Sequence, residues 1–65
     1  MMQPRDPFVL HAHAERANLA GRYDVAAQLF QEAAQHAFTR SGAAVLWEKA
    51  ITAKVMADGI RKAQA

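Results

Sequence analysis

A stretch that begins at Ala14 and reads AERANLAGRYDVAAQLFQEAA limits most strongly what this chain can fold into. Small side chains recur on both sides of one glycine: Ala14 and Ala17 precede Gly21, and Ala26 and Ala33 follow it. Alanines allow two antiparallel helices to approach closely, and glycine readily adopts the left-handed conformation that ends a helix. The stretch therefore predicts a helical hairpin that turns at Gly21, with Phe30 filling its centre.

Capping signals set the bounds of three predicted helices. Asp6 is a favourable N-cap residue, and Pro7 suits the first helical position, where no backbone N–H is needed. Residues 1–6 form a lead, disordered from Met1 to Arg5, before a single all-α domain over residues 7–65. Within that domain, the helices are expected at about residues 7–20, 24–40 and 43–64.

The third predicted helix carries two apolar strips that lie roughly 100° apart around its axis. A hairpin can cover only one strip, which leaves the other exposed unless something binds it. One strip is Leu46, Ala50, Ala53, Ala57 and Ile60, and the other is Trp47, Ile51 and Val55.

Tryptophan is enriched at binding hot spots, because a large rigid ring buries much area at a low entropic cost. Trp47, Ile51 and Val55 are therefore our first candidate partner-binding residues, and packing of Trp47 in the three-helix core is the alternative. Tyr23 and Arg22, at the tip of the hairpin, are the second candidates, and turn packing and solvation are the alternative there.

The small size of the chain also favours a partner. It has 65 residues and no cysteine, and alanine supplies 16 of its apolar residues. A domain of this length buries only about 60% of the surface of its unfolded chain, and small domains often gain stability by association. We therefore expect a small three-helix domain that forms a homodimer, folds on a partner, or does both.

The sequence contains no catalytic or cofactor-binding pattern. Ser41 is the only serine and lacks a nucleophile-elbow context, and the glycines are too isolated to cradle a phosphate. His11 and His13 are two positions apart and therefore point to different sides of the first predicted helix. His36 lies on the polar side of the second predicted helix, so the histidines do not form a closed set of metal ligands. We expect no enzyme activity, no metal and no cofactor.

Charge and hydropathy give two further expectations. The formal net charge of +2 is spread along the chain, so we do not expect nucleic-acid binding, and a small basic DNA-binding protein stays an alternative. No apolar run approaches the roughly 20 residues that span a bilayer, and no signal peptide is evident, which favours a cytoplasmic protein. The cations that would serve DNA binding lie on the third helix: Lys49, Lys54, Arg61 and Lys62.

The hairpin resembles a single tetratricopeptide unit. The positions that match are Gly21, Tyr23, Ala26, Phe30 and Ala33, whereas the usual leucine, glycine and proline positions hold His13, Ala14 and Phe38. No second copy follows at the period of roughly 34 residues, which excludes a repeat array. A three-helix adaptor of the MIT type, which binds a peptide helix between its own helices, stays open as an alternative.

A second resemblance covers most of the chain. With Ala14 directly before Glu15, then G-x-Y, A-A-x-L-aromatic and a tryptophan-bearing last helix, the chain resembles the ANR family of small bacterial and phage negative regulators of AraC-type activators, whose first motif is approximately A-x-x-x-E. Phe30 stands where we expect a tryptophan, and Ile51 follows Trp47 where arginine and cysteine are common. The resemblance implies an anti-activator that binds a transcription factor and blocks its dimerisation or its DNA binding. The matching residues are Ala14, Glu15, Gly21, Tyr23, Ala26, Ala27, Leu29, Phe30, Ala33, Ala37 and Trp47.

Overall fold

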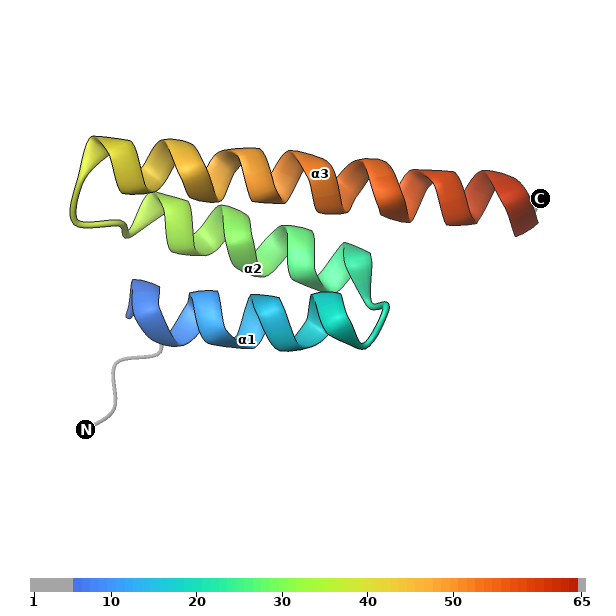
Figure 1. Ribbon diagram of the computed structural model, residues 1–65, viewed down its shortest axis with the longest axis horizontal. Helices are drawn as coiled ribbons and strands as arrows, with labels where there is room; N and C mark the ends of the chain where they lie inside the picture. Colours follow the sequence, from blue (N-terminus) through green and yellow to red (C-terminus); the bar gives the residue numbers. More distant parts are fainter. Residues whose placement is uncertain (1–5, 65) are drawn as a thin grey trace.

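A computed structural model describes residues 6–64, and within them the predicted all-α class is confirmed: three helices form and no strand does. The helices are α1 (Pro7–Leu19), α2 (Tyr23–Gln35) and α3 (Arg40–Gln64), shown in Figure 1. The disordered lead predicted for residues 1–5 lies outside the described residues, as does Ala65. No helix in the described range combines the length and hydrophobicity that crossing a membrane requires.

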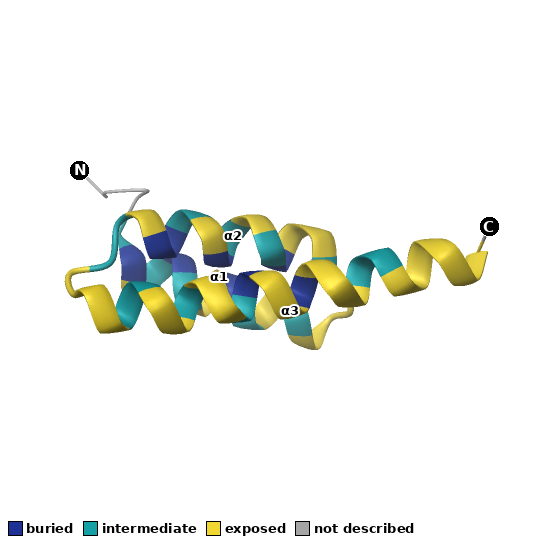
Figure 2. Ribbon diagram, turned by 90° about the horizontal axis from the view of Figure 1, so that it is seen from above, coloured by how far each residue is buried: buried dark blue, intermediate teal, exposed yellow. Residues whose placement is uncertain are grey.

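In the view of Figure 1, α2 lies between α1 and α3, and the view from above in Figure 2 shows that it is set back from both, so that the helices form a curved layer rather than a flat one. The Cα positions extend over 41 × 25 × 14 Å, and the shortest of these extents is about three times the diameter of roughly 4.6 Å of one helix's Cα cylinder. α2 packs extensively against both neighbours, whereas α1 and α3 make only a small contact with each other. The longest helix, α3, runs past the ends of α1 and α2 at its C-terminal end. This arrangement leaves both faces of the layer open to solvent or to a partner.

The first two helices begin and turn as the sequence predicts. The Asp6 carboxylate accepts a hydrogen bond of 2.9 Å from the Phe8 N–H, and Pro7 occupies the first turn of α1. Gly21 has a φ of +78°, and the N–H of the next residue, Arg22, donates to the Ala17 carbonyl at 2.9 Å. This pattern is a Schellman motif, which ends α1 and reverses the chain into α2.

The second turn differs from the prediction. The second helix ends at Gln35 rather than near residue 40, and the third begins at Arg40 rather than near residue 43. The reason is Thr39, whose hydroxyl accepts a hydrogen bond of 3.0 Å from Gly42 N–H and whose carbonyl accepts one of 3.0 Å from Ala43 N–H. These are the bonds of an N-cap residue, so Gly42 lies inside the first turn of α3 instead of separating two helices.

Alanine dominates the core. Among the described large apolar side chains only Phe30 and Leu10 are buried, at 2% and 5% exposed. The hairpin alanines pack as predicted, and Figure 2 shows the buried segments facing one another between the helices. The helices therefore pack closely through alanines rather than through bulky side chains, and most of the larger apolar side chains are exposed. The buried alanines are Ala14, Ala26, Ala33, Ala34, Ala50 and Ala53.

Candidate protein-binding surfaces

The α3 strip, which we define as Trp47, Ile51 and Val55, is exposed on α3. Trp47 is 39% exposed, Ile51 61% and Val55 62%, whereas Ala50 and Ala53 on the other predicted strip are buried against α2. Four-residue spacing at a rise of 1.5 Å per residue places the ends of the strip about 12 Å apart. The other predicted strip is buried or half-buried from Leu46 to Ala57, but its last member, Ile60, is 43% exposed, so the predicted covered strip ends before Ile60. The indole of Trp47 is partly covered and partly accessible.

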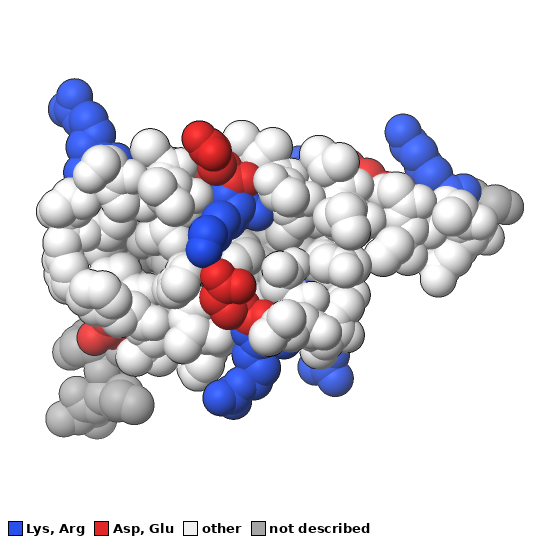
Figure 3. Space-filling view, in the orientation of Figure 1, with Lys and Arg blue, Asp and Glu red and all other residues white. Residues whose placement is uncertain are grey.

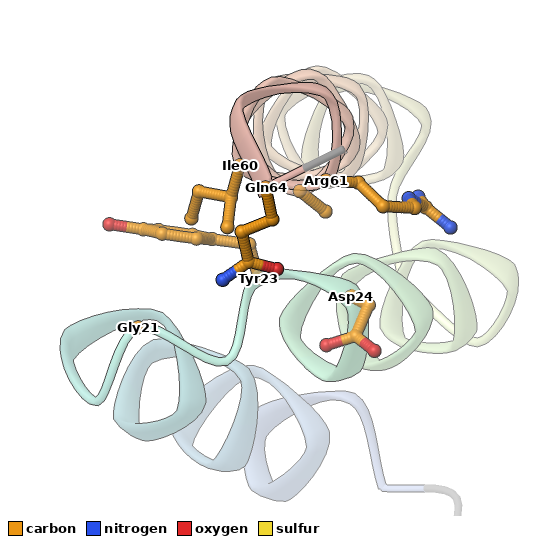
Figure 4. A pocket seen from close by; sticks show the side chains of 7 residues that line it. Gly21, Tyr23, Asp24, Ile60, Arg61 and Gln64 are labelled. Carbon is orange, nitrogen blue, oxygen red and sulfur yellow. The ribbon is translucent and has the colours of Figure 1, made fainter.

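The second candidates do not lie beside the α3 strip. Tyr23 is half-buried and lines a cavity of about 230 Å³ with Ile60 and Arg61, at the opposite end of the layer from Trp47. In Figure 4 the Tyr23 ring extends under Ile60, while Asp24 and Arg61 lie on the other side of Gln64. Ile60 lies 13 residues beyond Trp47, or about 20 Å along the helix.

A groove runs between α1 and α3, above α2, on the face of the layer shown in Figure 3. We call it the α1–α3 groove. Phe30 lies at its floor, and a cavity of about 330 Å³ opens above that ring. Glu15 of α1 accepts a hydrogen bond of 2.8 Å from the Lys49 ammonium of α3, which crosses the groove. Figure 3 shows these acidic and basic side chains meeting near the middle of the face, with uncharged surface on either side.

Electrostatics strengthen this bridge only moderately. The hydrogen bond from Lys49 holds the pKa of Glu15 below its ordinary value, against a smaller opposing effect of desolvation. Both side chains are 40% exposed, and solvent therefore screens the pair. His11 Nε2 lies 3.3 Å from Lys49 Nζ and 3.3 Å from the same Glu15 oxygen. The Lys49 ammonium also lies 5.8 Å from the centroid of the Phe30 ring.

A more apolar cavity of about 480 Å³ extends this groove past the N-terminal end of α1. The rings of Phe8 and Phe38 meet at its rim with centroids 5.6 Å apart, and both side chains are more than 70% exposed. Val45 lines both cavities and so connects them. The sequence did not predict this site, because Phe38 was assigned to the second helix and its contact with Phe8 joins residues thirty positions apart.

The histidines and lysine or arginine residues singled out in the sequence lie on different surfaces of the described structure. Among residues 6–64, no three His, Cys, Asp or Glu side chains lie close enough together to hold a metal ion. His11 belongs to the groove, whereas His13 lines a different cavity between α1 and α2. Of the four cations weighed for DNA binding, Lys49 is paired with Glu15, and Arg61 is paired with Asp58 at 2.6 Å.

Comparison of the chain with protein-family models, curated proteins and solved structures found no match.

Proposed function

We propose that this protein is a protein-binding module that acts as a transcriptional anti-activator. In this proposal the α3 strip contacts a bacterial transcription factor and blocks its dimerisation or its DNA binding. One observation carries the proposal: within residues 6–64, ten large apolar side chains are exposed, among them a tryptophan in line with an isoleucine and a valine on one helix. Monomeric soluble proteins seldom leave contiguous apolar surface of this kind uncovered.

The geometry of α3 suits a helix as the opposing surface. Residues four apart on a helix form a narrow ridge, and such a ridge packs into the groove of another helix. Glu48 and Lys54 are exposed on α3 near this ridge and would supply a charged rim around an apolar centre. An interface with a tryptophan at its centre and charges at its rim matches the anatomy of specific protein contacts. A dimerisation helix of a regulator is the kind of surface that such a ridge would cover.

The test compares capture of partners from a bacterial lysate by the wild type and by a W47A/I51A variant. The matched control is F8A/L19A, which removes two exposed apolar side chains from α1 and leaves the α3 strip intact. We expect the control to retain a transcriptional regulator that the W47A/I51A variant loses. A regulator retained equally by both variants would refute the assignment of the site, and recovery of no regulator would refute the anti-activator role.

The homodimer expected from the sequence is a separate proposal about the same strip. Light scattering on the wild type should give twice the molar mass of the chain, and the W47A/I51A variant should give the mass of one chain. A monomeric wild type at high concentration would refute self-association and leave the strip for another protein.

The continuity of the α1–α3 groove favours a second candidate function, an adaptor that binds a peptide helix. Two connected cavities of about 330 and 480 Å³ fall in the size range that takes a few large side chains. Val45 lies where they meet and is 55% exposed. A V45E variant should abolish binding by this mode while W47A/I51A leaves it intact, and the reverse pattern supports the α3 strip.

A further inference from the structure

A third surface, distinct from the α3 strip and the α1–α3 groove, lies where α1 meets α2. We call it the arginine cleft. Its apolar lining, which we call the floor, consists of Ala17, Ala20, Val25 and Leu29, and the other residues that line it are His13, Arg16 and Arg22. The cavity has a volume of about 380 Å³, within the range of sites that hold a large side chain or a small ligand. Val25 is 42% exposed, so part of this floor faces solvent.

The turn between α1 and α2 determines the placement of the two arginines. The Schellman motif brings the backbone N–H of Arg22 to 2.9 Å from the carbonyl of Ala17, the residue that follows Arg16. Arg22 therefore begins beside the last turn of α1 although six positions separate it from Arg16. Both side chains are exposed; Arg16 lies in the last turn of α1, and Arg22 is the N-cap residue of α2.

The charge of this cleft is uncompensated. No acidic side chain lines it, and no ion pair joins either guanidinium to a carboxylate of the described residues. The neighbouring cavities differ in this respect, since Asp24 accompanies Arg61 in one and Glu15 and Glu48 accompany Lys49 in another. The arginine cleft thus combines an apolar floor with two free cationic groups.

We propose that the arginine cleft binds an acidic amphipathic helix of a protein partner. A large apolar side chain of that helix lies on Val25 and Leu29, and Asp or Glu side chains near it bind the Arg16 and Arg22 guanidinium groups. Guanidinium groups bind carboxylates with two parallel hydrogen bonds, which gives the contact direction as well as attraction. Residues three or four apart on the partner helix share one face, so one helix presents both kinds of group together.

The apolar floor distinguishes this partner from a nucleic acid. A duplex is held mainly by cations arrayed along its phosphates, and it gains little from valine and leucine side chains between two arginines. An acidic amphipathic helix uses both parts of the cleft. The inference goes beyond the proposed function, because it concerns a surface formed by α1 and α2 and stands whether or not the α3 strip binds a transcription factor.

The test uses a fluorescent synthetic helical peptide with leucine and glutamate on one face, and fluorescence anisotropy as the measurement. Its partner peptide has each glutamate replaced by glutamine. The protein variants are R16Q/R22Q, V25S, and the control R61Q/K62Q, which removes two charges from the far end of α3. Amide chemical shifts of the labelled protein, recorded with the acidic peptide, locate the contact.

We expect the acidic peptide to bind the wild type, with shift changes centred on Arg16, Arg22 and Val25. Affinity should fall about tenfold or more in R16Q/R22Q and several-fold in V25S, and change less than about twofold in the control. The glutamine peptide should bind about tenfold more weakly. Equal losses in the control, equal binding of both peptides, shift changes elsewhere, no binding of the acidic peptide, or tighter binding of duplex DNA at this cleft would each overturn the proposal.

Discussion

The substitution F30A should remove most of the stability of this protein. Phe30 is the largest fully buried side chain in the described structure and contacts groups from both edge helices. Truncating a buried phenylalanine to alanine typically costs about 3–5 kcal/mol, from lost transfer free energy and the cavity left behind. A domain of 65 residues has a total free energy of unfolding of roughly 3–10 kcal/mol. The variant should therefore be largely unfolded or close to it.

The matched control makes the same change at Phe38, which is 74% exposed. The main loss there is the ring contact with Phe8, worth about 0.5–1.5 kcal/mol. A third variant, F30L, roughly conserves volume and should cost under about 1.5 kcal/mol, which keeps the measurement possible if F30A does not fold.

Urea unfolding followed by far-UV circular dichroism gives the three free energies of unfolding. We expect F30A to lose several times as much stability as F38A, with F30L between the wild type and F30A. A loss in F38A as large as that in F30A would refute the alanine-and-Phe30 core. It would mean that in solution Phe38 is buried by something that the single chain does not contain.

Three further predictions concern single positions and use the same unfolding measurement. G21A should destabilise the protein by about 1–2 kcal/mol, because the φ of +78° at Gly21 disfavours a side chain. G59A should stabilise it by about 0.5–1 kcal/mol, because the new methyl group has open space around it inside α3. Changes of the same sign in both variants would contradict the assigned backbone conformations. T39A should lose about 1 kcal/mol of stability, because it removes the N-cap of α3. T52A should change the stability little, because the Thr52 hydroxyl donates to the Glu48 carbonyl within the same helix. Equal losses in the two variants would refute the role of Thr39 as N-cap. Lys49 holds the pKa of Glu15 in the folded chain below its value in the unfolded chain. Between these two pKa values the unfolded chain binds more protons than the folded chain. The stability that the Glu15–Lys49 pair contributes is therefore complete above the ordinary glutamate pKa and is lost as the pH falls through the folded-state pKa. Because both side chains are 40% exposed, this contribution to the free energy of unfolding should stay below about 1 kcal/mol. An E15Q variant should lose less stability than the wild type on acidification, and an equal loss in both would contradict the assigned role of Glu15.

Local signals in the sequence were sufficient for much of the fold. Asp6 and Pro7 fix the start of α1, and Gly21 fixes its end, because each acts through bonds within a few residues of itself. The start of α3 was placed too late because Ser41 and Gly42 resemble a break. The signal that could have corrected it is Thr39, a favoured N-cap residue immediately before an alanine-rich segment.

The surfaces were predictable only in part. The α3 strip follows from helical periodicity, which is a property of one segment. The α1–α3 groove and the arginine cleft depend on which helix lies between the other two. No sequence pattern within a single helix predicts that arrangement. The bridge between Glu15 and Lys49 joins residues 34 positions apart, so it exists only once α2 has separated the two edge helices by a fixed distance.

The alanine-rich interior has a consequence for how stability responds to temperature. Heat capacity rises on unfolding in proportion to the apolar surface newly wetted, and here much of that surface already faces water in the folded chain. An average domain of this length would show about 0.8–1.0 kcal/mol/K, and calorimetry on the single chain should give less. The stability curve would then be broad and shallow, with cold and warm limits far apart and a low summit between them.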